Sequence, residues 1–524
     1  MLERAMQTFL RRLGTFLLGF LCGFDRLRFR GSKRQLCYPN GIVGFLQHRG
    51  IAFRDFKPYA LDVTESLFQA IEPPAKQAGI YRYLNSNHLS PEETALAIAA
   101  EHGKTQGLVA VLGRVEPCQT IEFRRDASGW WTPYLKSGAK CLHYYHYYLD
   151  PDFGLRYTRM QSWFPFTMHQ GINGRDWLAR QMTKAGLGYV QKENCFTWVE
   201  DFEAAQRLLD QQLTTAWPAL LENWAVQSNP LEKTFLGKPV SYYWTVQEGE
   251  YATDLVFRTP EDLQRLYPAW IHQAYALLQS GNLLRYLNYR LRADGRPRAN
   301  DTIDLKTTVK EFMEGTCVRH RVQGNLLKMY NKMGNVLRVE TMLTDVTHFK
   351  VFRRTEGEEG VQRYLRLRKG VADLHRRAEV SQGINERYIG ALATVEEKKP
   401  LGEVAAGLGK RQRWKGRSVR ALNPLSESDV ALLEAVNRGE FMLHGLRNQD
   451  VRRLLFADPA AEDPAEEKRR SAQVTRWLRL LRAHGLLAKI PKTHRYQVTE
   501  KGRTTINALL AARRANTKQL LEAA

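Results

Sequence analysis

Residues 327–341 read LKMYNKMGNVLRVET, and this stretch decides which class of fold the chain can adopt. Two runs of strand-forming residues flank the polar, glycine-containing segment NKMGN, which is the pattern of an antiparallel β-hairpin. We expect a five-residue loop with the cross-strand pairs Tyr330–Val336, Lys328–Arg338 and Leu326–Glu340. A two-residue turn at Met333 and Gly334 is the alternative, but it would mix polar and apolar side chains on each face.

The expected register gives the hairpin an apolar face and a charged face, because side chains alternate along a strand. The apolar face holds Leu327, Met329, Leu337 and Val339. The charged face has the composition of a site that attacks phosphodiesters, with Tyr330 as nucleophile and Glu340 as base or metal ligand. The cations that would offset phosphate charge are Lys328, Lys332 and Arg338. A structural hairpin with a salt-bridged, exposed face is the alternative.

This hairpin is similar to one found in a known class of proteins. YNK followed by LRVE resembles the YDK and RxE hairpin of plasmid and phage rolling-circle replication initiators. That resemblance implies DNA nicking or replication initiation. Asn331 stands where those proteins have an aspartate, so no residue role is carried over.

Two sets of residues are candidate metal ligands. In GEYATD, Glu250 and Asp254 would join Glu340 around Mg²⁺ if the fold brings their segments together. The segment HYYHYYLDPD offers a second set, which is His143, His146, Asp150 and Asp152. A strand of alternating aromatic residues is the simpler account of that second set. Similarly, HYYHYY and YTRMQSWFPF fit either stacking on single-stranded bases or an aromatic core.

The composition favours a polyanionic partner. The 524 residues include 78 Lys or Arg and 55 Asp or Glu, which leaves a net charge of +23. Such a field attracts nucleic acid or an acidic membrane surface. Hydrophobic residues make up 43% of the chain, so it folds, and its length requires several domains.

Several function classes are excluded or disfavoured. The six cysteines form no CxxC pair, which argues against a zinc ribbon or redox dithiol and fits a reduced cytoplasm. No Walker loop, GxSxG or HExxH motif is present. The apolar run 15–24 follows Arg11 and Arg12 but is too short to span a bilayer, so we expect a buried helix and no membrane contact.

The pattern of elements predicts an α+β fold with a large, mixed, mainly antiparallel sheet. The expected regions are a mostly helical part over 1–105, an α+β part over 106–394, a basic linker over 395–424 and a winged-helix domain over 425–524. Ser90 and Asn173 have the sequence context of helix caps. Further helices are expected over 261–286 and 373–392, and strands within 107–163.

The expected linker is strongly basic. It carries Lys410, Arg411, Arg413, Lys415, Arg417 and Arg420 around Trp414. It is interpreted either as a solvated tether or as an arm that lies along phosphates with Trp414 stacked on a base.

The C-terminal hundred residues read as three short helices, a strand pair and a final helix. In the third helix, Val474, Trp477, Leu478 and Leu481 share an apolar stripe and should point inward. The residues left facing outward are Gln473, Arg476, Arg479 and Arg482. The turn between the two strands carries Lys492, Thr493 and Arg495. A winged helix used only for protein docking is the alternative function for this layout.

The phrase RLLRAHGLLAKIPKTHRYQVTEKG resembles the recognition helix and wing of bacterial MarR-like regulators. The resemblance implies that the outward row of the third helix meets base edges and phosphates, and that Lys492, Thr493 and Arg495 touch the minor groove or backbone. Across the chain, FDRLRFRG, WFPF, NGRDWLARQM and KGVADLHRRAEVSQ resemble a widespread family of uncharacterised bacterial proteins present in several copies in some genomes. That multiplicity implies a mobile element.

These observations predict a DNA-binding protein of a bacterial mobile element. Its α+β part would act in nicking, recombination or replication initiation, through Tyr330 or through Mg²⁺ held by Glu250, Asp254 and Glu340. A non-catalytic transcription regulator and an RNA-binding scaffold of a ribonucleoprotein are the alternatives.

Overall fold

The computed structural model describes most of the chain. The described residues are 4–85, 90–232, 241–274, 283–284, 286–287, 304–312, 315–354, 361–393, 401–438, 441, 445–456, 464–491 and 493–515. The expected helix over 261–286 begins at Pro260 as α8 (Pro260–His272), and residues 275–282 lie outside this description.

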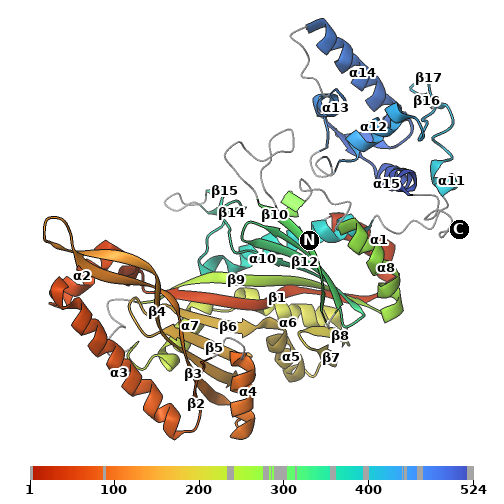
Figure 1. The fold of residues 1–524 in the computed structure, drawn as a ribbon. Helices are drawn as coiled ribbons and strands as arrows, with labels where there is room; N and C mark the ends of the chain where they lie inside the picture. The colour runs from red at the N-terminus through yellow and green to blue at the C-terminus, as the bar shows by residue number, and fades with distance from the viewer. Residues whose placement is uncertain are drawn as a thin grey trace.

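An eleven-stranded sheet forms the body of the molecule (Figure 1). Its strands are β1 (Leu17–Ser32), β2 (Tyr81–Tyr83), β3 (Gly107–Arg125), β4 (Trp131–Asp150), β5 (Gly154–Gln161), β6 (Met168–Asn173), β9 (Tyr243–Phe257), β10 (Leu305–Phe312), β11 (Gly315–Val322), β12 (Asn325–Lys332) and β13 (Val336–Met342). The spatial order is β10-β11-β12-β13-β9-β1-β6-β5-β4-β3-β2, and among the described strands only the β2–β3 pair is parallel. The predicted α+β class with a mainly antiparallel sheet is confirmed.

Helices cover both faces of this sheet (Figure 1). The helices of the body are α1 (Arg4–Leu13), α2 (Pro39–His48), α3 (Phe56–Gln77), α4 (Pro91–Glu101), α5 (Gly174–Lys184), α6 (Phe202–Thr214), α7 (Trp217–Ser228), α8 and α10 (Leu374–Leu392). On one face, Asn385 of α10 donates to the Tyr251 carbonyl of β9 at 3.1 Å. On the other, Gln206 of α6 hydrogen-bonds both backbone groups of Cys22 in β1 at 2.8 Å. The predicted caps Ser90 and Asn173 begin α4 and α5.

The expected buried helix over 15–24 is wrong, because residues 17–24 of this run lie in β1, in the middle of the sheet. Gly19 and Gly23 explain the difference. A Cβ atom at Gly19 would lie 2.3 Å from the Phe202 ring, and one at Gly23 would lie 2.6 Å from Leu209. The glycines therefore let α6 pack directly against the strand, and this long-range contact leaves no local signal.

The hairpin of β12 and β13 forms with its predicted faces but in a different register. Its pairs are Tyr330 with Arg338, Lys328 with Glu340 and Lys332 with Val336. The loop is the three-residue segment 333–335, with φ of +51° at Met333 and +83° at Gly334. The shift of two residues keeps every side chain on its expected face. Leu327, Met329, Leu337 and Val339 all lie in the buried core beneath α10 and α8.

Residues 401–515 form what is here named the C-terminal module, with its own buried cluster. Its elements are α11 (Leu401–Ala405), β16 (Gln412–Trp414), β17 (Arg417–Val419), α12 (Glu427–Val436), α13 (Asn448–Leu455), α14 (Pro464–Ala483), β18 (Leu487–Lys489), β19 (Tyr496–Val498) and α15 (Glu500–Arg514). Leu408 and Leu422 of the expected linker are buried in that cluster. The segment 401–424 is therefore packed on the module and is not simply a solvated tether.

Two smaller hairpins complete the fold. They are β7 (Tyr189–Lys192) with β8 (Cys195–Val199), and β14 (Lys350–Arg354) with β15 (Gln362–Arg366). Among the described helices, none combines the length and the apolar character that a membrane crossing requires.

Candidate functional site

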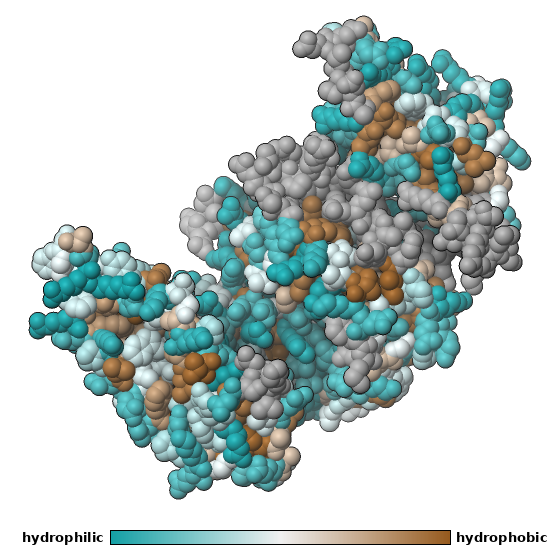
Figure 2. Space-filling view, viewed as in Figure 1, coloured by the Kyte–Doolittle hydropathy of each residue, from teal (hydrophilic) through white to brown (hydrophobic). Residues whose placement is uncertain are grey.

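The charged face of the β12–β13 hairpin is buried, and not exposed as one sequence interpretation had it. Side chains from β9, β12 and β13 meet there, and we use "charged face" for Glu250, Asp254, Lys328, Tyr330, Lys332, Arg338 and Glu340. The turn between β7 and β8 lies over part of it, since the Asn194 carbonyl accepts from Arg338 Nη2 at 2.6 Å. Figure 2 shows a mostly hydrophilic hollow in the middle of the body, where Figure 1 draws β1 and β6.

Arg338 is the centre of a buried ion-pair cluster. Its Nε and Nη2 atoms donate to the two oxygens of Asp254 at 2.6 and 2.9 Å, and its Nη1 donates to Asp25 Oδ2 at 3.1 Å. Arg175, in the first turn of α5, lies 2.9 Å from Asp254 Oδ2. All four side chains are at most 1% exposed. Arg338 is thus committed to two carboxylates and cannot contact a phosphate without rearrangement.

The two aspartates of this cluster have opposite electrostatic environments. Burial alone would raise the pKa of Asp254, but Arg338 and Arg175 outweigh burial and hold that pKa below its ordinary value. Burial raises the pKa of Asp25 above its ordinary value, because the same arginines offset only part of the desolvation. Asp25 Oδ1 is also buried and accepts no hydrogen bond from the residues that the structure describes.

Three carboxylates converge beside the cluster. One oxygen each from Asp25, Glu250 and Glu340 lies within 4.8 Å of the others, and we name this group the carboxylate trio. Lys328 Nζ contacts Glu340 Oε1 at 2.5 Å and Glu250 Oε1 at 3.3 Å. Burial would lower the pKa of Lys328, but Glu340 and Glu250 raise it above its ordinary value. Lys328 therefore stays charged and partly neutralises the trio.

A β-bulge brings Asp25 to the trio. In the pairing of β1 with β9, Phe24 lies opposite Tyr251 and Arg26 lies opposite Glu250, so Asp25 is an additional residue without a partner. Bulges of this kind redirect one side chain of a strand. Asp25 was not among the residues predicted from the sequence, where its only signal is an acidic residue between apolar and basic residues in FDRLRFRG.

Of the predicted ligands, Glu250 and Glu340 belong to the trio, whereas Asp254 is held by Arg338 and Arg175. The second predicted set does not gather. Burial lowers the pKa of both His143 and His146 to about 4, so they are neutral core side chains. Asp150 pairs with Arg156, and Asp152 pairs with Lys184.

Tyr330 is half-buried next to Lys328, whose Nζ lies 5.9 Å from the ring centroid. Burial and the Glu340 carboxylate raise the pKa of its phenol above the ordinary value, although Lys328 acts in the opposite direction. The phenol therefore holds its proton strongly, which is unfavourable for a tyrosine nucleophile.

The aromatic segments HYYHYY and YTRMQSWFPF contribute side chains to the buried core. Tyr144, Phe164 and Phe166 are at most 1% exposed. This outcome favours the aromatic-core interpretation of HYYHYY and YTRMQSWFPF over base stacking by those rings.

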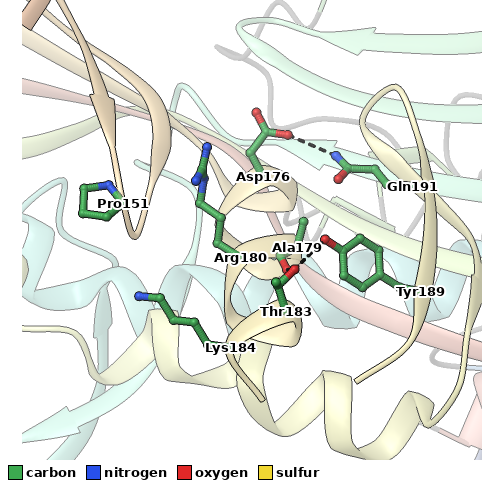
Figure 3. Close-up of a pocket in the computed structure, with 8 residues that line it drawn as sticks. All are labelled: Pro151, Asp176, Ala179, Arg180, Thr183, Lys184, Tyr189 and Gln191. Atoms are coloured by element: carbon green, nitrogen blue, oxygen red, sulfur yellow. Dashed lines mark hydrogen bonds between the residues drawn. The ribbon is translucent and has the colours of Figure 1, made fainter. Parts of the chain in front are cut away.

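A pocket of about 410 Å³ lies along the outer side of α5 (Figure 3). Arg180 and Lys184 of α5 point toward Pro151, which lies in the β4–β5 turn. Asp176 of the same helix points toward Gln191 of β7. Gln191 Nε2 donates to Asp176 Oδ1 at 3.0 Å. Burial raises the pKa of Asp176 above its ordinary value. The pocket is mixed in charge, so its lining does not by itself select an anionic or a cationic ligand.

The predicted DNA-contacting residues of α14 differ in their exposure and contacts. Arg476 and Arg479 are exposed on α14, and Gln473 is half-exposed beside them. Arg482 lies over the Trp414 and Tyr496 rings, at 5.1 and 5.7 Å from their centroids.

The remaining predicted contacts lie in the two hairpins of the module. Thr493 Oγ1 donates to the Ile490 carbonyl at 2.9 Å and accepts from the Arg495 amide, which shapes the β18–β19 turn. Lys492 lies outside the described residues. Lys410, Arg411, Arg413 and Lys415 are exposed on and beside the β16–β17 hairpin.

No protein-family profile, curated protein or solved structure matches this chain. The resemblances drawn from the sequence therefore stay predictions.

Proposed function

We propose that the protein binds duplex DNA through its C-terminal module, acting as a winged helix-turn-helix with α14 as recognition helix. The observation that carries this proposal is the position of Arg476 and Arg479. They are exposed on α14, while Val474, Leu478 and Leu481 of the same helix are buried. Neither arginine makes an ion pair within the described residues, so both are available to phosphates and base edges.

The surroundings of α14 support the same proposal. Asn448 of α13 donates to the Ser471 carbonyl and to Thr475 Oγ1 at 2.8 and 2.9 Å, which fixes α13 against α14. The β18–β19 pair follows α14 directly, in the place of a wing. The contact of Arg482 with Trp414 holds the β16–β17 hairpin next to the same helix. The exposed cations of that hairpin thus extend the basic surface.

Fluorescence anisotropy with a labelled random duplex tests this proposal. The variant Arg476→Ala/Arg479→Ala should lose affinity by about tenfold or more, since each arginine contact is worth about 1–3 kcal/mol. Lys501→Ala/Arg513→Ala is the matched control, because it removes the same charge from exposed positions of α15. Equal affinity of the first variant and the wild type would show that α14 is not the DNA-binding helix.

The carboxylate trio supports a second activity, which is metal-dependent cleavage of phosphodiester bonds. Three carboxylate oxygens within 4.8 Å of one another suit a hard divalent cation such as Mg²⁺. The buried and unbonded Asp25 Oδ1 is the additional observation in favour of a ligand there. Asp25, Glu250 and Glu340 would hold the ion, which would polarise a phosphate oxygen and acidify a bound water.

The chain's own residues have definable roles in such a site. Lys328 Nζ contacts two of these ligands, Glu250 and Glu340. If metal binding displaced the ammonium group from these carboxylates, its charge would be available to a scissile phosphate. Arg338 and Arg175 would act as positioning residues, because they hold Asp25 and Asp254 and are fully buried.

Binding and cleavage can be measured separately. Titration with Mn²⁺, followed by electron paramagnetic resonance, should show one bound ion that is lost in Asp25→Asn and in Glu340→Gln. Supercoiled plasmid and single strands should be cut with Mg²⁺ and not with EDTA. A covalent protein–DNA adduct that survives denaturation and vanishes in Tyr330→Phe would instead establish Tyr330 as nucleophile.

A further inference from the structure

The β14–β15 hairpin exposes two aromatic rings side by side. Phe352 and Tyr364 are directly opposite each other across the hairpin, with 54% and 69% of their surfaces exposed. Their ring centroids lie 5.3 Å apart at an angle of 54°. Large apolar side chains that are exposed together commonly mark a binding surface.

The hairpin is fixed to the body by the face opposite the two rings. Val351 is buried in the same cluster as residues of α10, and Leu367, just after β15, is 4% exposed and donates its amide to the Phe349 carbonyl at 3.0 Å. The two rings therefore project outward from an anchored platform, and their exposure does not arise from a loose segment.

The face that carries the rings is strongly basic. Lys350, Arg354 and Arg366 alternate with the aromatic positions along the two strands, and all three are exposed. None of the three makes a hydrogen bond or ion pair through its side chain in the described part of the chain. Residues 350–369 contain seven Lys or Arg and three Glu; the seven cations lie in 350–354 and 362–369, and the three Glu lie in the connecting segment 355–361. The partner of this surface must combine flat apolar groups with closely spaced negative charges.

We propose that this hairpin binds an unpaired segment of DNA, with bases stacked on Phe352 and Tyr364 and phosphates at Lys350, Arg354 and Arg366. Aromatic rings interleaved with cations are the means by which proteins hold single strands. In a duplex the base faces are stacked on each other, so the rings would find no partner there. The inference extends the proposed DNA binding to a second surface that is separate from α14.

Anisotropy with three labelled probes tests the assignment: an oligothymidylate of about 20 nucleotides, an abasic strand of equal length and charge, and a duplex of the same length. Phe352→Ala/Tyr364→Ala should weaken oligothymidylate binding about tenfold or more and leave the abasic strand and the duplex unchanged. Trp130→Ala is the control, because Trp130 is 74% exposed on the distant β3–β4 turn. Photocrosslinking of a bromodeoxyuridine strand, read by mass spectrometry, should label residues of β14 or β15.

The outcomes separate this inference from the proposed function. Loss of duplex binding in Arg476→Ala/Arg479→Ala reports on α14 alone, whereas loss of oligothymidylate binding in the aromatic variant reports on the hairpin. Unchanged oligothymidylate affinity in Phe352→Ala/Tyr364→Ala, or equal losses for the abasic strand, would overturn the stacking assignment. Tighter binding of oligouridylate than of oligothymidylate would overturn the assignment to DNA.

Discussion

The charged face of the sheet and the exposed face of α14 both carry arginine, yet they place it in opposite environments. Arg338 is fully buried and contacts Asp254 and Asp25. Arg476 and Arg479 are exposed and have no acidic partner in the described part of the chain. Buried arginines are thus committed to the fold, while exposed ones remain available to a polyanion.

The difference has an energetic cause. Moving a guanidinium from water into a protein interior costs several kcal/mol, which only well-placed carboxylates offset. Such a cluster gains little net stability as a whole, but the loss of one member leaves the opposite charge buried and unpaired. Exposed arginines carry no such penalty, and their removal changes the folded state very little. The comparison can therefore be tested by matched substitutions in the two regions.

The largest effect is expected from Arg338→Met. It should lower the free energy of unfolding of the body by about 3–5 kcal/mol, because Asp254 and Asp25 would lose their principal counter-charge. Nine of the eleven tryptophans lie within residues 1–393, so urea unfolding followed by tryptophan fluorescence reports mainly on the body. The matched variant Arg479→Met should change that transition by less than about 0.5 kcal/mol. Similar effects of the two variants would remove the distinction between the regions.

The faces of the β12–β13 hairpin could be predicted because alternation is a local property of a strand. Its register could not, because the turn requires Met333 at a positive φ, which residues other than glycine rarely adopt. The caps Ser90 and Asn173 were equally local and were predicted at the correct positions.

The trio itself was only partly predictable. Glu250 and Glu340 could be proposed as ligands from residue type, whereas Asp25 depends on a bulge formed with β9, more than 200 residues away in the chain. The packing of Gly19 and Gly23 on α6 is a similarly distant contact. Sequence patterns thus identified the candidate ligands within one β-strand, but they did not identify which β-strands become neighbours in the sheet.

The next largest effect concerns pH and the buried polar groups of the body. His320 is fully buried between Tyr388 and Thr307, and burial lowers its pKa to about 4. The unfolded chain, with a pKa near 6.5, binds the proton more readily, so the stability present above pH 6.5 is lost as the pH falls toward 4. At pH 5 this loss amounts to about 2 kcal/mol.

The variant His320→Gln should therefore lose less stability than the wild type between pH 7.5 and pH 5, by about 2 kcal/mol in urea unfolding. His48→Gln, which removes an exposed imidazole, is the control. A pH dependence that is the same in His320→Gln and in the wild type would show that this histidine titrates normally in the folded protein.

A smaller effect is expected from the salt dependence of duplex binding. Each phosphate contact contributes about 0.9 to the slope of log affinity against log salt concentration. Loss of two contacts should therefore reduce the slope by about 1.8 in Arg476→Ala/Arg479→Ala. The slope should not change in Arg338→Met, measured at a temperature at which that variant is folded. Anisotropy between about 50 and 200 mM salt measures both slopes. A reduced slope in Arg338→Met would place the buried arginine in contact with DNA.

The smallest effect should come from a helix cap in the module. Thr499 Oγ1 accepts from the Gly502 amide at 2.9 Å and begins α15, so Thr499→Ala should destabilise the module by about 1 kcal/mol. The buried cluster of the module shares no residue with the four buried clusters found in the described part of the body. The loss should therefore appear in far-ultraviolet circular dichroism as an earlier step of helix melting and should leave the tryptophan transition of the body unchanged. A shift of both the circular dichroism and the tryptophan transitions would mean that the module and the body unfold as one unit. The two regions would then differ in the environment of their arginines and not in their stability.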